Sequence, residues 1–374
     1  MKQIAKPRNP SMDVIRTFAI LFVVSVHFFA NIKYNDVPVV GGSMYVMTLF
    51  RTFFMICVPL FLLLSGFLMC NKPVSLSHYG KLIRTLVIYA LAGLLCHLFV
   101  TEIQGKEVAW RKFLVDLLRF RAAPYGWYVE MYIGLFLLCP FLNVLYHNLK
   151  NQKQKLLLVL TLFFITSLPT MTNIYHPALS WFLNPASESS YLKVLPDYWI
   201  MFYPVTYYII GCYLREFPLK LNKWLHLGLM AATFVVNGSF NFYRSHGVNL
   251  ILGLWQQYYG VFQVLMSVLF FTFFANLSYR RLPRWCATVL RYISEWSFGA
   301  YLLSWIFDQW FYPILRNAVP TVAGRFWYFP VMVGAVFLCS TLLSGLLNVI
   351  YNTVSRQGKR LIHFKKGGSQ LERL

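Results

Sequence analysis

The sequence predicts an all-α integral membrane protein, a bundle of about ten transmembrane helices with both termini in the cytoplasm. Hydrophobic residues make up 58% of the 374 residues, charged residues make up 12%, and the mean hydropathy is +0.55. A water-soluble domain of this length rarely has such a composition. The net charge of +22 is spread over the segments between apolar runs. That distribution is typical of the positive-inside rule and argues against a nucleic-acid-binding surface.

Ten apolar runs are long enough to cross the roughly 30 Å hydrocarbon core of a bilayer. An even number of crossings places both termini on one side of the membrane. Of the 34 Lys and Arg residues, 23 fall in the N-terminal segment, the alternate loops and the tail, which makes that side cytoplasmic. The predicted spans are residues 14–32, 46–70, 79–100, 125–146, 155–174, 199–215, 224–243, 257–275, 292–312 and 326–354.

We expect residues 1–354 to form one transmembrane domain and residues 355–374 to form a short basic cytoplasmic tail. The outer segment 101–124 departs from the charge trend, because it carries five basic residues. It is apolar on one face and basic on the other, as in a helix lying in the membrane interface. It could equally be a solvated charge run, face an acidic or phosphorylated acceptor, or show that the predicted topology is wrong there.

Seven cysteines are scattered singly along the chain, and no CxxC pair occurs. This pattern argues against a zinc site and against a disulfide framework. We therefore expect no metal cofactor.

Arg16 and His27 lie in the first apolar run, eleven residues apart. On a helix this spacing returns to within roughly 20° of the same direction and separates the two residues by about 16 Å along the axis. With Arg16 at the cytoplasmic edge, His27 would lie near mid-membrane, where an ionisable residue usually marks a cavity and a function. The arginine suits phosphate groups, and the histidine could accept a proton from a hydroxyl. Alternatively, Arg16 anchors the helix at the head groups and His27 is a buried neutral imidazole.

Five further positions could carry chemistry. Ser65, which precedes a glycine, permits close helix packing or a hydrogen bond into a cavity. Lys81 and Arg84 lie three residues apart and could hold a second phosphate, or could simply obey the positive-inside rule. Glu130 is an isolated acid within a span, so it could pair with a basic residue or contact a substrate hydroxyl in a catalytic role. Asp308 is a weaker candidate, because it lies near the outer end of a span and could reach water.

These residues resemble motifs of the membrane acyltransferase-3 family. The family's opening helix, a basic residue followed by ten others and a histidine, is similar to MDVIRTFAILFVVSVHFF, with Arg16 and His27 at the two positions. Its second-helix motif resembles PLFLLLSGFLM, which contains Ser65. Its pair of basic residues corresponds to Lys81 and Arg84, with lysine where arginine is usual. The replacement loses a bidentate fork for phosphate.

Two later segments extend the resemblance. The tryptophan-containing segment WYVEMYIGLFLLCPFL is similar to the family's fourth segment and places Trp127, Glu130 and Pro140. A Ser-Tyr-Gly-x-Tyr-Leu-x-His signature resembles SFGAYLLS, but Phe298 replaces the tyrosine and Ser304 replaces the histidine. We therefore assign no role to Ser304.

The resemblance implies transfer of an acyl group, usually acetyl, from cytoplasmic acetyl-CoA or another acyl-CoA to a sugar hydroxyl at the outer side of a bacterial inner membrane. Arg16, Lys81 and Arg84 would hold the phosphates of coenzyme A. His27 would act either as the general base for the acceptor hydroxyl or as a transient acyl carrier. Ser65 is a conceivable oxyanion donor.

Many relatives carry an additional extracytoplasmic esterase-like domain, and this sequence shows none. We therefore expect direct transfer to a lipid-linked sugar or a nascent glycan, with membrane lipid as the other partner and no nucleic acid. One alternative is a transporter or flippase of a glycolipid or acylated small molecule, which would cleave no thioester. The sequence lacks the internal repeats and paired broken helices of many transporters. A second alternative is a structural membrane protein with an inert histidine.

Overall fold

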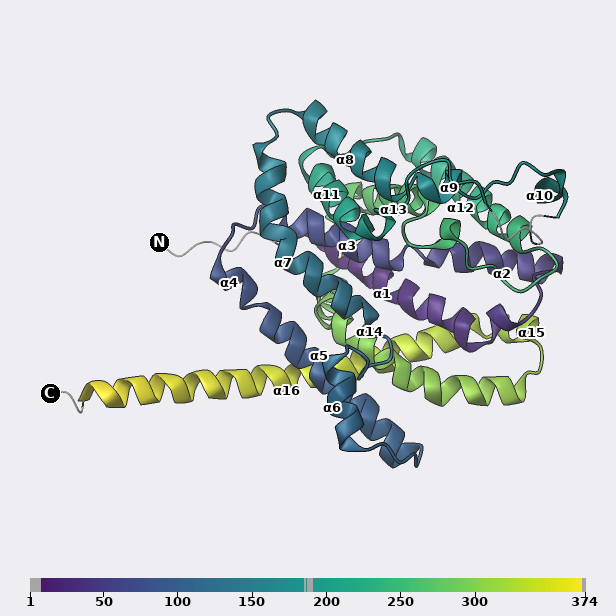
Figure 1. The fold of residues 1–374 in the computed structure, drawn as a ribbon. Helices are drawn as coiled ribbons and strands as arrows, with labels where there is room; N and C mark the ends of the chain where they lie inside the picture. The colour runs from purple at the N-terminus through teal and green to yellow at the C-terminus, as the bar shows by residue number, and fades with distance from the viewer. Residues whose placement is uncertain (1–7, 185, 187–190, 372–374) are drawn as a thin grey trace.

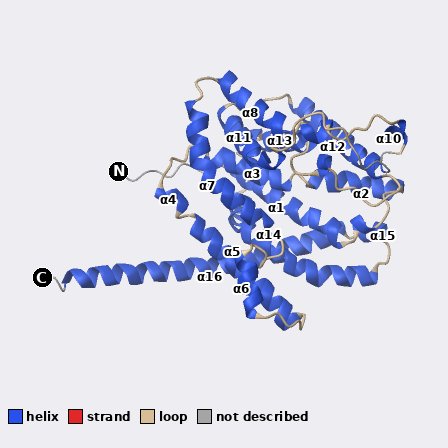
Figure 2. Ribbon diagram, in the orientation of Figure 1, coloured by secondary structure: helices blue, strands red, loops and turns tan. Residues whose placement is uncertain are grey.

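A computed structural model of the chain describes residues 8–184, 186 and 191–371, and these residues form helices joined by loops (Figures 1 and 2). No strand occurs among them, apart from two isolated bridges. The α-helices are α1 (Pro10–Asn31), α2 (Gly41–Phe54), α3 (Cys57–Met69), α4 (Leu76–Tyr79), α5 (Leu82–Leu98), α6 (Trp110–Leu118), α7 (Trp127–Asn148), α8 (Gln152–Thr166), α9 (Pro169–Thr172), α10 (Leu179–Leu183), α11 (Tyr203–Glu216), α12 (Lys223–Ser245), α13 (Val261–Asn276), α14 (Arg284–Ala318), α15 (Val322–Phe326) and α16 (Phe329–Leu371). Shorter helical turns are η1 (Tyr34–Asp36), η2 (Phe99–Ile103), η4 (Ile200–Phe202) and η5 (Leu254–Gln256).

Within the described residues, seven helical segments are long and apolar enough to cross a membrane. They confirm a multi-pass, all-helical membrane protein, whereas the predicted number of ten spans is not confirmed. The other three predicted spans correspond to α11, α12 and α14. Helix α11 has 14 residues, fewer than the roughly 20 that a spanning helix needs. The start of α1 and the far end of α16 lie toward the same side in Figure 1, and the compartment on that side stays a prediction.

The predicted span 46–70 is two helices, α2 and α3, separated at Met55 and Ile56. Proline supplies the physical reason, because Pro59 has no backbone N–H to donate to the carbonyl four residues earlier. The last helix, in contrast, is longer than the predicted span 326–354. Helix α16 continues without a break past residue 355, where we expected the tail to begin, and it projects beyond the bundle in Figure 1.

Helix α1 lies at the centre of the bundle and packs against α2, α3, α13, α14 and α16. Its apolar residues surround the helix on nearly all sides, as expected for a helix enclosed by others. Ile15, Ala19, Val24 and Phe28 have no exposed surface. The two residues that the sequence singles out on this helix are therefore held in the interior.

Helices α3 and α11 approach each other closely at two glycines. An ideal Cβ at Gly66 would lie 1.9 Å from the carbonyl oxygen of Tyr208, and one at Gly211 would lie 2.3 Å from that of Leu63. Small residues let membrane helices pack backbone to backbone. Of the two roles considered for Ser65 and the glycine that follows it, close helix packing therefore describes Gly66.

The segment 101–124 contains the predicted amphipathic helix as α6. Phe113 is buried against His97, whereas Trp110, Leu114 and Leu118 are exposed. Helix α6 protrudes from the side of the bundle beside the end of α5 (Figure 1). Its position in the membrane interface stays a prediction.

Replacing Gly66 with alanine should lower the melting temperature of the purified protein, because a backbone carbonyl cannot move aside as a flexible side chain does. Overpacking of this kind costs about 1–3 kcal/mol. Gly134→Ala on α7 is the matched control, since nothing lies within 4 Å of its new Cβ. Alanine favours a helix by up to about 1 kcal/mol over glycine, so the control should melt at the same or a slightly higher temperature. Equal melting temperatures for the two variants would contradict the close crossing.

Candidate active site

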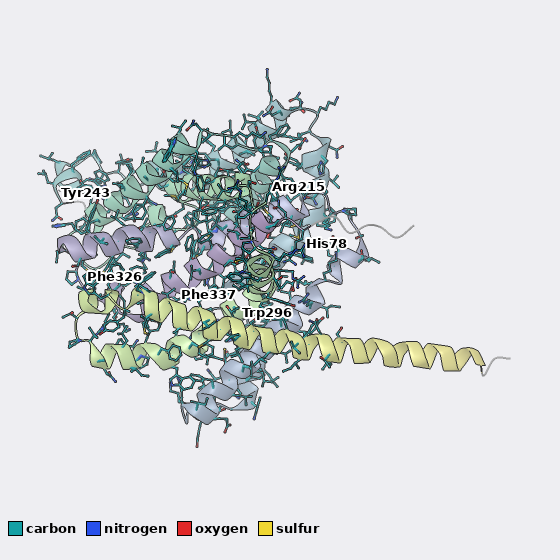
Figure 3. All side chains as sticks on the ribbon, turned by 180° about the vertical axis from the view of Figure 1, so that it is seen from behind. His78, Arg215, Tyr243, Trp296, Phe326 and Phe337 are labelled. Atoms are coloured by element: carbon teal, nitrogen blue, oxygen red, sulfur yellow. The ribbon has the colours of Figure 1, made fainter. Side chains whose placement is uncertain are left out.

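A cavity of about 1150 Å³ lies among α1, α3, α5, α7, α11, α14 and α16. Its wall includes Arg8, from the segment before α1, together with Arg16 of α1, Arg84 of α5 and Arg215 of α11. Arg84 is near the start of its helix and Arg215 near the end of its own, so the arginines gather at one end of the bundle. Figure 3 shows Arg215 at this end, with Tyr243 and Phe326 at the opposite end.

Only one of these arginines has an acidic partner in the described part of the chain. Nε and Nη2 of Arg8 donate to the two carboxylate oxygens of Asp13 at 2.8 and 2.7 Å, and Nη1 donates to Glu295 at 2.5 Å. The hydrogen bonds to Asp13 raise the pKa of Arg8 above its ordinary value. This network fixes the start of α1 against α14 and gives Glu295, the acid that the cavity wall contains, a basic partner. Because one guanidinium is shared by two carboxylates, the three side chains together keep one negative charge.

The other three arginines donate to neutral oxygens. Arg16 Nη1 donates to Ser294 Oγ at 3.0 Å, and Arg84 Nη2 donates to Asn348 Oδ1 at 3.0 Å. Arg215 Nη1 donates to the carbonyl of Phe67 at 2.7 Å. Uncharged acceptors orient a guanidinium without cancelling its charge. This end of the cavity is therefore electropositive and suited to an anionic group.

The structure places the two members of the predicted basic pair differently. Both side chains are exposed, but Arg84 contributes to the cavity wall, whereas Lys81, at the start of α5, lies outside that wall. Arg215 was not identified from the sequence, because the positive-inside rule accounts for a basic residue at a helix end equally well.

Aromatic residues line the cavity farther along α7 and α14. The ring of Tyr128 lies 5.9 Å from the ring of Tyr132 and 5.9 Å from that of Tyr301, measured between centroids. The hydroxyl of Tyr301 is enclosed and forms no hydrogen bond with the described residues. This part of the wall can accommodate an apolar chain that carries occasional polar groups.

His27 lies one helical turn beyond the cavity wall. Along α1 the wall contains Met12, Arg16 and Val23, and His27 follows Val23 by four residues on the same face. Its ring stacks on that of Tyr125, with centroids 3.7 Å apart and an interplanar angle of 29°. Nδ1 is enclosed without a hydrogen-bond partner, although the residue as a whole retains some accessible surface.

The carboxyl group of Asp308 lies behind this pair of rings. Tyr125 Oη donates to Asp308 Oδ2 at 2.7 Å. Asn31 Nδ2 donates to the carbonyl of His27 at 2.9 Å and contacts Tyr125 Oη at 3.5 Å. Asp308 is only 1% exposed, so the expectation that it reaches water is wrong. Tyr125 was not identified from the sequence, because a tyrosine before a helix carries no signal of its own.

Ser65 and Glu130 lie in different places from those their predicted roles suggest. Ser65 lies in the cavity wall, and its hydroxyl donates to the carbonyl of Phe61 at 2.8 Å. Because the carbonyl of Phe67, two residues later, accepts from Arg215, Ser65 lies toward the arginine end of the cavity. The expectation of a buried Glu130 is wrong: its side chain is exposed, outside the cavity wall and without an ion pair among the described residues.

Comparison with protein families gives one match, to the model of the acyltransferase domain of family 3, over residues 9–345. The chain belongs to the acyltransferase-3 family. The matched region includes the cavity up to α14, the arginines from Arg16 onward, and His27. No curated protein and no solved structure matches the chain. This member of the acyltransferase-3 family is thus a membrane-embedded enzyme of acyl transfer, which confirms the family resemblance of its sequence motifs.

Proposed function

We propose that this protein transfers an acyl group, most simply acetyl, from cytoplasmic acyl-CoA to a sugar hydroxyl of a glycan or lipid-linked saccharide at the outer side of a bacterial inner membrane. One observation carries the proposal. The face of α1 that contributes Arg16 to an electropositive cavity also carries His27 one turn beyond the cavity wall. A phosphate-bearing donor bound at the arginines would therefore lie along the same helix face as a proton acceptor.

The donor would bind with its phosphates at the arginine end. Arg16, Arg84 and Arg215 each have N–H groups beyond those used in the hydrogen bonds to neutral oxygens. Guanidinium groups bind phosphate oxygens with strong, often paired hydrogen bonds. Ser65, at this end of the cavity, suits a contact with the donor better than the oxyanion role, because the thioester would lie near His27.

The pantetheine arm would extend along the cavity past the tyrosines, since about 16 Å of helix axis separates Arg16 from His27. Near His27 the acceptor hydroxyl would attack the thioester carbonyl. The imidazole takes the hydroxyl proton, the new ester C–O bond forms, and the C–S bond breaks to release the coenzyme A thiol after proton return. In the other route, His27 carries the acyl group before the hydroxyl accepts it. The exposed Glu130 has no place in either route.

His27→Ala should abolish transfer of radiolabelled acetyl from acetyl-CoA to a membrane sugar-lipid extract by the purified protein in lipid. Loss of a general base lowers the rate by about 100-fold or more, and loss of an acyl carrier abolishes turnover. His246→Ala is the control, because His246 is exposed and outside the cavity wall. Transfer by a folded His27→Ala protein at the wild-type rate would overturn the role of His27. Absence of coenzyme A binding and of turnover in the folded wild type would instead favour the flippase.

Arg84→Ala and Lys81→Ala should differ in donor binding, although both remove a positive charge near the start of α5. Loss of a charge-assisted hydrogen bond costs about 1.5–3 kcal/mol, or roughly 10- to 100-fold in affinity. We expect the Kd for acetyl-CoA to rise by about this factor for Arg84→Ala, which removes a guanidinium from the cavity wall, and by less than about twofold for Lys81→Ala, because Lys81 lies outside that wall. Isothermal titration calorimetry in nanodiscs would measure both. Equal effects would show that the general basic charge of this end, not the cavity wall, binds the donor.

A further inference from the structure

The loop between α6 and α7 brings Tyr125 into the bundle and holds it there. Tyr89 of α5 anchors the loop, since its hydroxyl accepts from the backbone N–H of Ala122 at 3.2 Å and donates to the carbonyl of Leu117 at 3.4 Å. An ideal Cβ at Gly126 would lie 2.5 Å from the carbonyl oxygen of Phe120. The turn that follows Tyr125 is therefore too tight for a side chain. This backbone places the phenol ring over His27.

The orientation of the His27 ring depends on this stack. A catalytic histidine is usually oriented by a hydrogen bond from the ring nitrogen that does not react. Here Nδ1 of His27 is enclosed and has no partner among the described residues. The ring of Tyr125, at 3.7 Å between centroids, is the contact that fixes the imidazole plane.

Asp308 in turn fixes Tyr125. Its Oδ2 accepts the tyrosine hydroxyl at 2.7 Å, and its Oδ1 is enclosed with no hydrogen-bond partner among the described residues. A carboxyl group buried in this way costs stability. In a membrane protein such a residue is by default a functional one. The hydrogen bond of Asp308 to Tyr125 links this carboxyl group, through the tyrosine ring, to His27.

We propose that Asp308 and Tyr125 are positioning residues for His27. The proposal rests on the proposed function of His27. The hydrogen bond to Asp308 holds the tyrosine ring stacked on the imidazole, at an interplanar angle of 29°, and so limits the orientations that the imidazole can take. When His27 takes the proton of the acceptor hydroxyl, the face of the phenol ring stabilises the imidazolium by a cation–π interaction.

The test is a set of variants that separates the ring from its hydrogen bond. Tyr125→Phe keeps the ring and loses the bond to Asp308, whereas Tyr125→Leu loses both. Asp308→Asn keeps an oxygen that accepts the tyrosine hydroxyl, whereas Asp308→Leu has none. The measurements are kcat for acetyl transfer, the Kd for acetyl-CoA and the melting temperature of each purified protein in lipid.

Misplacement of a catalytic group by about 1 Å can cost 100-fold in rate, so we expect Tyr125→Leu to lower kcat by about 10- to 100-fold. Tyr125→Phe and Asp308→Leu should both lower kcat by a similar, smaller factor. Asp308→Asn should have a kcat close to that of the wild type. The Kd for acetyl-CoA should stay at the wild-type value throughout, because neither residue lies in the cavity wall.

Tyr34→Phe is the matched control. Tyr34 is fully buried, and its hydroxyl is hydrogen-bonded to Thr48 at 2.6 Å, in the way that the hydroxyl of Tyr125 is bonded to Asp308. Within the described part of the chain, its ring packs edge-on against Phe29 and forms no hydrogen bond or ring contact with His27. It should lower the melting temperature and leave kcat unchanged. If the Tyr125 and Asp308 variants behave in the same way, their role is structural and the inference is overturned. If His27→Ala retains transfer, the proposed function of His27 fails, whatever the other variants show.

Discussion

The enclosure of α1 by the other helices is the constraint on which the rest of the structure depends. A helix in lipid satisfies its own backbone, but a charged side chain on it needs a partner or a cavity. Because α1 packs against five other helices, Arg16 and His27 face other parts of the protein and not the surrounding lipid. Arg16 lies in the cavity wall, and His27 lies between that cavity and the Tyr125 loop. The alternative of a simple head-group anchor at Arg16 therefore loses its support.

The charges at the two ends of this arrangement are balanced differently. At the start of α1, Arg8 is neutralised by Asp13 and Glu295, whereas Arg16, Arg84 and Arg215 are held by neutral oxygens. Beyond the cavity, His27 has a carboxyl group behind its stacked tyrosine. An anion is thus favoured at the arginine end, whereas a positive charge that develops on His27 would face the ring of Tyr125. The proposed donor binding and the proposed proton transfer need these two environments, and one helix face connects them.

Close backbone packing makes these positions rigid. The α3–α11 crossing at Gly66 and Gly211 fixes two walls of the cavity, because α3 contributes Ser65 and α11 contributes Arg215. The turn at Gly126 fixes Tyr125 in the same way. In both places the contacting atoms are main-chain atoms, which cannot adjust as side chains do. The proposed function, in which a long flexible donor is aligned with one imidazole, would benefit from such a scaffold.

The sequence by itself determined the all-helical membrane architecture, the shared helix face of Arg16 and His27, and the family. Composition, apolar run length and helical spacing are local properties, so they can be read without a fold. The sequence did not determine which charged residues near helix ends line the cavity, so Arg84 and Arg215 could not be distinguished from Lys81. It also could not show that the side chain of Glu130 is exposed. Tyr125 and Asp308 lie about 100 and 280 residues from His27, and only tertiary packing brings them together. The direction a side chain takes around a membrane helix depends on which neighbour covers each face, and no local pattern contains that information.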